Sequence, residues 1–202
     1  MKKIIFIFLI PFICLGQKYK VVGTSTDFFS WAPLENITAI SNDLEGIVDI
    51  NNGEFFFRLP IKSFTFKRSL MQKHFNDKYL NSDDYPFATF KGKSYNLKQE
   101  LTKVIDKAKA NKILNQEESI ITKQLSELFD QGILVEGKLM IHGEENDVKI
   151  KIVLSLDKKL IKFYTMFFVK TDDYKIKIPK LLKDNISEKI EVKVSGHLEL
   201  LD

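Results

Sequence analysis

The stretch that decides the fold is residues 133–156, ILVEGKLMIHGEENDVKIKIVLSL. Between residues 133 and 141 every second position is apolar or glycine, and between residues 148 and 156 every second position is apolar. A period of two is typical of a β-strand with one face in the protein interior and the other in water. The polar run from Gly143 to Asp147 predicts a turn between the two segments. The stretch therefore predicts two antiparallel strands with one solvated face.

The same alternation recurs along the chain. Residues 54–61, 161–169 and 190–200 each place apolar side chains on one parity. Turn-forming residues follow or precede these segments at 51–53 and 157–159. Many strands joined by short turns indicate a barrel or a sandwich.

One short segment has helical spacing instead. Between residues 69 and 80 apolar side chains recur three or four positions apart. Ser69 suits the position before a helix, and Pro86 disfavours helix at the residue before it. We expect a helix of about three turns here, followed by a loop.

A longer segment, residues 97–131, also interrupts the strand pattern. Residues 97–114 carry an apolar helical stripe, and Asn115 with Glu118 resembles a capping box before a second stripe. Gly132 would end the second helix. The segment predicts an inserted helical hairpin.

The amino-terminal sequence MKKIIFIFLIPFICLGQ predicts a secretory signal peptide. Two lysines precede an apolar run that is too short for a transmembrane helix, and cleavage is expected after Gly16. Residues 17–202 would then form a single periplasmic or secreted domain, with no stable membrane insertion. The only cysteine, Cys14, lies within the predicted signal, so the mature chain would have no thiol or disulfide.

The charge and the aromatic residues argue against a nucleic-acid partner. The formal net charge is +4, and removing Lys2 and Lys3 lowers it by two, to +2. A charge this small does not favour nucleic acid. The chain has 17 phenylalanines and one tryptophan, and most of the phenylalanines alternate along the predicted strands, as interior residues do.

The sequence contains few candidates for chemistry. His74 and Asp77 could share a metal ion, but two ligands do not make a site and no third is evident nearby. His142, next to Glu144 and Glu145, could be a general base, although a histidine in a turn more often hydrogen-bonds the backbone. No nucleophile with a base and an orienting group is apparent. We therefore expect no enzyme activity, no metal and no cofactor.

Several motifs, in order along the chain, resemble those of the YceI-like proteins, and in particular of their Bacteroidetes-type members. They are FFSWAPLE at 28–35, FTF at 64–66, LMQKHFN at 70–76, DYPFATFKG at 84–92, GKLMIHG at 137–143 and IPKLL at 178–182. The resemblance covers most of residues 19–202. Two features depart from the family pattern: Glu144 and Glu145 after the His-Gly pair, and the insertion at 97–131.

The resemblance implies an exported, mainly β protein: an extended lipocalin-like antiparallel barrel of about eight strands with a short cover helix. It also implies a long apolar cavity that holds a polyisoprenoid or another lipid-like chain, and no established catalytic residues. Strand parity and the expected cover helix give the residues that should line this cavity: Phe57, Leu59, Phe75, Tyr79, Val135, Leu139, Ile152, Phe163 and Phe167.

Two alternatives stay open at this point. The chain could be an enzyme acting on a lipid-like substrate, with His142 or His74 as its base. It could also be a structural or interaction protein whose barrel is filled by its own phenylalanines. A homodimer is among the assemblies that the sequence allows. The insertion could reshape or cover one end of the cavity.

Overall fold

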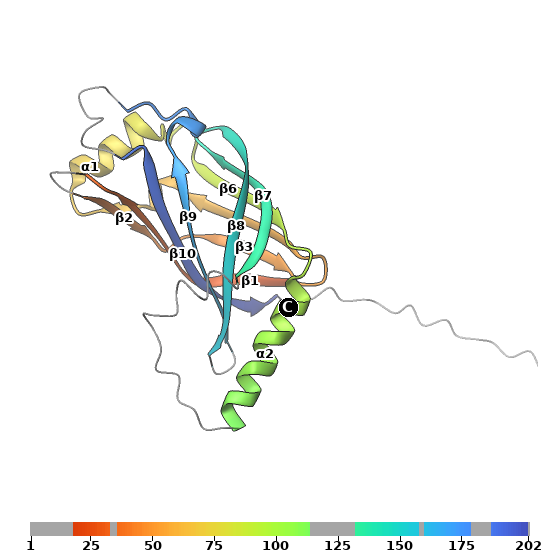
Figure 1. Cartoon of the computed structure of the whole chain (residues 1–202). Helices are drawn as coiled ribbons and strands as arrows, with labels where there is room; N and C mark the ends of the chain where they lie inside the picture. The colour runs from red at the N-terminus through yellow and green to blue at the C-terminus, as the bar shows by residue number, and fades with distance from the viewer. Residues whose placement is uncertain (1–17, 33–35, 114–131, 158–159, 179–186, 202) are drawn as a thin grey trace, which may run out of the picture.

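A computed structural model describes residues 18–32, 36–113, 132–157, 160–178 and 187–201. These residues form a closed antiparallel β-barrel with helices at its two ends (Figure 1). The barrel wall is built from eight strands: β1 (Lys18–Ser30), β3 (Glu45–Asp49), β4 (Glu54–Pro60), β6 (Phe87–Lys93), β7 (Ile133–Ile141), β8 (Glu144–Asp157), β9 (Leu160–Lys170) and β10 (Lys189–Leu200).

The sheet closes because β10 pairs with β1 along most of its length, from Tyr19 opposite Leu200 to Phe29 opposite Glu191. Two shorter strands extend the sheet beyond the barrel: β2 (Ile37–Ser41) and β5 (Thr65–Phe66). The first half of β1 pairs with β3 and its second half with β2. The predicted eight-stranded barrel is confirmed.

The strands follow the alternation expected from the sequence. Along β7 the side chains of Ile133, Val135 and Leu139 are buried, while Leu134 and Glu136 between them are exposed. Charged residues opposite one another on the outer face form exposed ion pairs, as Glu136 does with the residue opposite it on β8. Such pairs contribute little stability, so the wall depends on its inner face.

The hairpin between β7 and β8 is tighter than predicted. The turn is only His142 and Gly143, whose φ angles of 52° and 75° suit a two-residue hairpin. The predicted turn over Gly143 to Asp147 is wrong, because Glu144 and the three residues after it pair with β7. Their polar side chains mark the outer face and edge of a strand rather than a loop.

The predicted short helix is present next to the barrel. It consists of α1 (Ser69–His74) and a π-helical turn, η2 (Phe75–Tyr79). Ser69 is the first helical residue rather than the cap, since Arg68 occupies the capping position. The structure also contains two single 3₁₀ turns, η1 (Ile61–Ser63) and η3 (Asp172–Tyr174).

The second helix in the structure, α2 (Leu97–Ile113), lies at the opposite end of the barrel from α1 (Figure 1). Its first turns bury Leu97 and Leu101 in the main hydrophobic core and contact β8. The second helix of the predicted hairpin falls outside the described residues. Among the residues that are described, no helix is long and apolar enough to cross a membrane.

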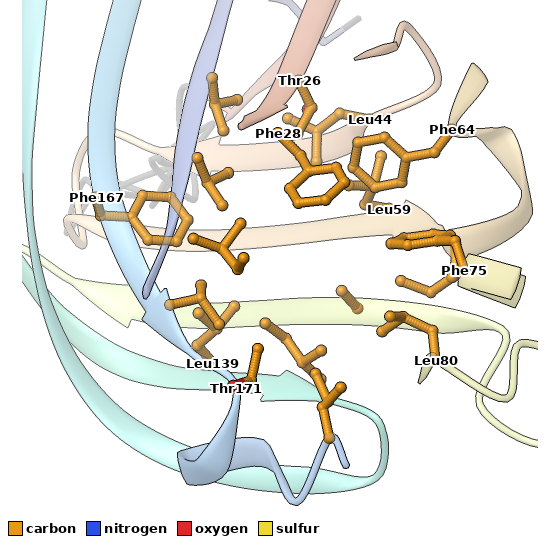
Figure 2. Close-up of a pocket in the computed structure, with 18 of the residues that line it drawn as sticks. Thr26, Phe28, Leu44, Leu59, Phe64, Phe75, Leu80, Leu139, Phe167 and Thr171 are labelled. Carbon is orange, nitrogen blue, oxygen red and sulfur yellow. The ribbon is translucent and has the colours of Figure 1, made fainter. Parts of the chain in front are cut away.

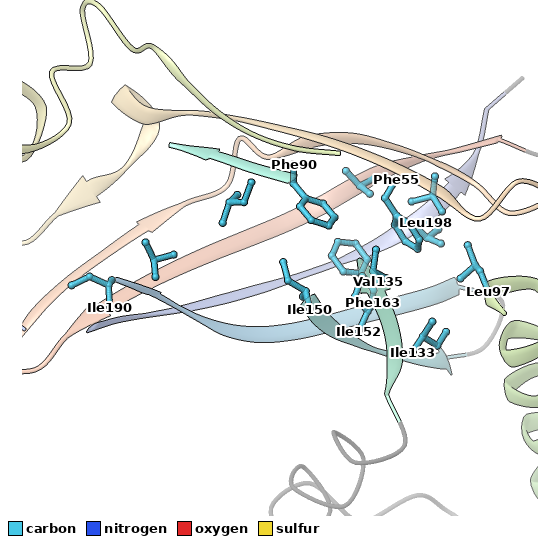
Figure 3. Close-up of a cluster of buried hydrophobic side chains, with 14 of the residues drawn as sticks. Phe55, Phe90, Leu97, Ile133, Val135, Ile150, Ile152, Phe163, Ile190 and Leu198 are labelled. Atoms are coloured by element: carbon cyan, nitrogen blue, oxygen red, sulfur yellow. The ribbon is translucent and has the colours of Figure 1, made fainter. Parts of the chain in front are cut away.

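The main hydrophobic cluster runs along the barrel interior from the end next to α2 to the end next to α1. Figure 3 shows Leu97 and Ile133 beside the start of α2, with Val135, Phe55 and Leu198 close by. Val135 is fully buried. We refer below to the end next to α2 as the α2 end, and to the end next to α1 and η2 as the α1 end.

Candidate ligand cavity

The α1 end of the barrel is hollow. It contains a cavity of about 460 Å³, lined by side chains from the barrel strands, α1 and η2 (Figure 2). This volume lies in the range of ≈ 300–1,000 Å³ found for small-molecule sites. Within the described part of the chain, no Asp, Glu, Lys or Arg lines the cavity; its polar lining residues are threonines, His74 and Tyr79. The cavity therefore suits an apolar ligand.

An aromatic cluster fixes η2 against the barrel. The ring of Phe75 lies 4.9 Å from that of Phe66, 5.6 Å from that of Phe64 and 5.8 Å from that of Phe28. These rings come from η2, from the segment around β5 and from β1. Aromatic pairs at such distances contribute beyond their buried area, so the cluster holds the cover of the cavity in place.

Three phenyl rings form the floor of the cavity. The ring of Phe57 lies 6.3 Å from that of Phe90 and 6.2 Å from that of Phe163. These residues come from β4, β6 and β9, so the rings reach across the barrel interior. We call this set the phenyl floor; beyond it lies the packed core of the α2 end.

Each ring of the phenyl floor lies over a glycine. A Cβ atom at Gly46 would lie 2.3 Å from the ring of Phe57, one at Gly92 2.4 Å from that of Phe90, and one at Gly196 2.9 Å from that of Phe163. Gly46 and Gly196 are directly opposite their phenylalanines on neighbouring strands. The missing side chains give the rings the room to lie flat against the wall.

Eight of the nine residues predicted to line a cavity do so in the structure. They are Phe57, Leu59, Phe75, Tyr79, Leu139, Ile152, Phe163 and Phe167. Val135 is not among the residues that line this cavity; its side chain is fully buried in the main hydrophobic cluster. That the eight residues contact a ligand stays a prediction.

The sequence reasoning missed the contribution of β1 and β10. Thr26 and Phe28 of β1 line the cavity, as do Val192 and Val194 of β10. The alternation of residues 190–200 predicts the strand β10, but it does not show which strand pairs with it. The closing pair of β1 and β10 joins residues more than 160 positions apart, which no local pattern indicates.

The threonines of the lining differ in their hydrogen bonds. Thr165 donates its hydroxyl to the Lys151 carbonyl oxygen at 2.8 Å, and Thr171 donates to that of Glu188 at 3.4 Å. The Thr26 hydroxyl, although that residue is only 1% exposed, has no hydrogen-bond partner among the described residues. Figure 2 shows Thr26 beside Phe28 and Leu44.

The histidines considered above lie in different settings. His142 donates from Nδ1 to the Tyr174 carbonyl oxygen at 3.1 Å, and its ring packs against Tyr85 at 4.7 Å. The interpretation of His142 as a turn residue bonded to the backbone is thus confirmed. His74 lines the cavity from α1. Among the described residues, no three His, Cys, Asp or Glu side chains cluster as metal ligands would.

Two tyrosines at the α1 end are kept in the neutral form. Burial raises the pKa of the Tyr79 phenol, which lines the cavity, above its ordinary value. Burial, together with the nearby charge of Asp173, raises the pKa of Tyr174 to about 12. At neutral pH neither phenol adds charge to this end of the barrel.

Comparison with known proteins places these features in a family. The model of the YceI-like domain matches residues 19–198. The fold resembles that of a polyisoprenoid-binding domain from Saccharophagus degradans, with a TM-score of 0.61, 14% identity and coverage of 92% of this chain and 99% of that chain. BcnA of Burkholderia cenocepacia gives a TM-score of 0.58 at 13% identity, covering 87% and 94% of the two chains. The Campylobacter jejuni YceI protein gives 0.51 at 16% identity, covering 83% and 88%. No curated protein matches.

Proposed function

Because this chain belongs to the YceI-like domain family, we propose that it binds a polyisoprenoid or another long apolar amphiphile in the cavity at the α1 end. The observation that carries the proposal is the apolar cavity of about 460 Å³ at the α1 end, next to the phenyl floor. The similarity to a structure described as a polyisoprenoid-binding domain supports the class of ligand.

Burial of a hydrocarbon chain supplies enough free energy for such binding. At ~0.8 kcal/mol per buried CH₂, a chain of ~20 carbons would gain about 16 kcal/mol if all of it were buried. Association costs roughly 4–15 kcal/mol, and the remainder can still give useful affinity. Binding therefore needs no charged anchor, in agreement with a cavity whose described lining contains no charged carboxylate, lysine or arginine.

The cavity also favours binding over a purely structural role. A barrel filled by its own phenylalanines would have no space at the α1 end, whereas here the rings of Phe57, Phe90 and Phe163 fill only one layer. The enzyme alternative, with His142 or His74 as base, has less support. The His142 ring is engaged by a backbone carbonyl and a tyrosine ring, and no carboxylate is among the described residues that line the cavity with His74.

Extraction of the purified protein with organic solvent, followed by mass spectrometry, tests the proposal. We expect a lipid-like molecule in near-stoichiometric amount, and its loss when Ala88, which lines the cavity, is replaced by phenylalanine. Replacement of the exposed Tyr95 by alanine is the control and should leave the lipid content unchanged. A wild-type protein that yields no lipid and takes none up when lipids are added would refute the proposal.

Export is part of the same proposal, because a carrier of membrane-derived lipids would act outside the cytoplasm. The support is the charged and apolar sequence before Gln17. Sequencing the amino terminus of protein recovered from the periplasm or medium should give Gln17 as the first residue. Recovery of the chain only from the cytoplasm, with Met1 retained, would contradict it.

A further inference from the structure

Two strongly exposed apolar side chains lie beside the cavity at the α1 end. Leu70 of α1 is 63% exposed, and Trp31, the residue after β1, is 62% exposed. Apart from Tyr95, they are the most exposed large apolar side chains of the described residues. Each is next in sequence to a residue that lines the cavity, since Met71 follows Leu70 and Ala32 follows Trp31. We call the segments that carry them the cavity rim.

The helical part of the cavity rim has a face toward the cavity and a face toward solvent. Met71, His74 and Phe75, which are three and four positions apart, line the cavity. Leu70 and Lys73, three positions apart, are exposed. The solvent face of a surface helix is normally polar, so the apolar Leu70 beside a lysine is unexpected in water.

Contacts between their neighbours place Trp31 close to the same helix. The ring of Phe28, three residues before Trp31, lies 5.8 Å from that of Phe75 (Figure 2). Ile37 of β2 and Met71 of α1 pack against one small cluster of buried side chains. The loop with Trp31 and the helix α1 are therefore neighbouring parts of one surface.

The segment that carries Leu70 is basic. Between residues 62 and 84 the chain has five basic side chains and three acidic ones, and one of the acidic ones, Asp83, forms an ion pair with Lys62. Between residues 67 and 78 the ratio is four to one, and α1 itself has no acidic residue. The basic residues of this stretch are Lys67, Arg68, Lys73 and Lys78. Charge complementarity therefore favours an anionic partner.

An anionic lipid surface fits this combination of side chains. Tryptophan is enriched where lipid headgroups meet hydrocarbon, and apolar side chains of a surface helix enter the same layer. Lysines near an anionic membrane add electrostatic attraction. The centre of a protein–protein interface is instead depleted of charged residues, whereas Leu70 lies three positions from Lys67 and three from Lys73.

We propose that the α1 end docks on anionic membranes, with Trp31 and Leu70 in the interfacial layer and Lys67 and Lys73 toward the lipid headgroups. This orientation brings the cavity next to the bilayer from which an apolar ligand would be taken. The inference goes beyond the proposed function, because attachment to a membrane is measured independently of what the cavity holds.

Sedimentation with vesicles tests the charges of the cavity rim. The chain from Gln17, the expected mature form, is used so that the predicted signal sequence does not itself bind lipid. Wild type should bind vesicles of phosphatidylcholine and phosphatidylglycerol in equal amounts, and vesicles of phosphatidylcholine alone at least about tenfold more weakly. One lysine near an anionic surface changes the affinity about fivefold, which corresponds to about 1 kcal/mol. Lys67→Gln with Lys73→Gln should therefore weaken binding to the mixed vesicles at least about tenfold.

Matched substitutions near α2 are the controls. Lys98 and Lys107 are exposed on α2, and replacing both by glutamine changes the net charge by the same amount. This variant should bind the mixed vesicles within about twofold of wild type, because charges far from the membrane are screened. Leu70→Ser should weaken binding, since it removes an apolar side chain from the interface. Tyr95→Ser, which removes the exposed aromatic ring just before α2, should not.

Fluorescence reports the orientation, because Trp31 is the only tryptophan. On docking, its emission should shift to shorter wavelength, and phosphatidylcholine with brominated acyl chains in the vesicles should quench it. A second protein, with Trp31→Phe and Tyr95→Trp, carries its tryptophan at the α2 end instead. This protein should still bind the vesicles, and its emission should be neither shifted nor quenched.

The outcomes separate docking from the proposed function. No binding of wild type to the mixed vesicles would refute docking, and lipid in the solvent extract of that protein would leave the proposed function standing. Equal loss of binding in the two lysine pairs, or quenching only of the tryptophan introduced by Tyr95→Trp, would place the contact elsewhere and refute docking. Vesicle binding by a protein that neither yields nor takes up lipid would refute the proposed function alone. Since all the substituted side chains are exposed, thermal unfolding should show every variant folded.

Discussion

Two phenylalanines on opposite sides of the phenyl floor give a direct measure of whether the α1 end is hollow. Phe167 lines the cavity and is half-buried, whereas Phe55 is 7% exposed and is not among the residues that line it. Both point into the barrel from its wall. The same substitution at the two positions therefore differs mainly in whether space exists beside the ring.

Substitution by tryptophan gives the clearest contrast. At Phe55 a larger ring must displace packed neighbours, which typically costs about 1–3 kcal/mol. At Phe167 the extra atoms enter existing space, so the free energy of unfolding should change by less than about 0.5 kcal/mol. A change of 1 kcal/mol shifts the melting temperature of a domain of this size by roughly 2–4 °C. Phe55→Trp should therefore melt roughly 2–12 °C lower, and Phe167→Trp within roughly 2 °C of wild type.

Substitution by alanine gives a second, independent contrast. Phe55→Ala opens a new void and should cost about 3–5 kcal/mol. Phe167→Ala enlarges a void that already exists, so only the transfer cost of at most ~1.5–3 kcal/mol remains. Thermal unfolding of lipid-free proteins measures both series, and extraction with mass spectrometry should show less lipid in Phe167→Trp alone. Equal destabilisation by tryptophan at both positions would mean that the α1 end is packed, and the reasoning would be wrong.

Four further predictions concern other parts of the molecule. Leu101→Ala should lower the free energy of unfolding by about 2–5 kcal/mol, measured by denaturant titration, and leave lipid content unchanged, because this side chain packs at the α2 end. Gly143→Ala should lower the melting temperature, since its φ of 75° is unfavourable for alanine and the new Cβ would lie 2.5 Å from a tyrosine ring; an unchanged melting temperature would contradict the two-residue turn. Because the pKa of Tyr174 is about 12 in the folded protein and about 10 when unfolded, its contribution to stability is complete below pH 10 and is lost as the pH rises from 10 through 12. Tyr174→Phe should flatten that alkaline loss in pH-dependent unfolding. Replacing His74 and His142 together by glutamine should leave lipid content nearly unchanged on extraction; a lipid-converting activity abolished by this change would instead favour the enzyme alternative.

The sequence predicts which side chains of a strand point into the barrel, but not how far along the barrel each of them lies. Val135 and Leu139 lie on one strand with the same parity, and both point into the barrel. Parity repeats every second residue along the whole strand, so it cannot tell the hollow end from the packed end. That distinction depends on which rings from other strands meet at the same level, as Phe57 and Phe163 do. These contacts are long-range and leave no local signal.

For the helices and turns, too, the local sequence does not indicate where an element lies in the fold. The apolar stripe from Leu97 to Leu101 predicted a helix, and α2 is present, but only the structure shows that this helix seals the packed end rather than the cavity. The polar run after His142 predicts a turn, because charged residues are common in turns. In a barrel they equally occupy the outer face of a strand, and the two positive φ angles at His142 and Gly143 suffice to reverse the chain.

The glycines next to the phenyl floor affect how deep the cavity is. Their absent side chains leave room for the three rings to lie against the wall, and the position of the rings bears on the depth of the cavity. A methyl group at Gly46 or Gly196 would lie 2.3 Å or 2.9 Å from its ring, so the ring would have to move away from the wall and the cavity would change shape. For a lipid held as proposed, the length of chain that fits would therefore depend on these glycines as well as on the residues that line the cavity.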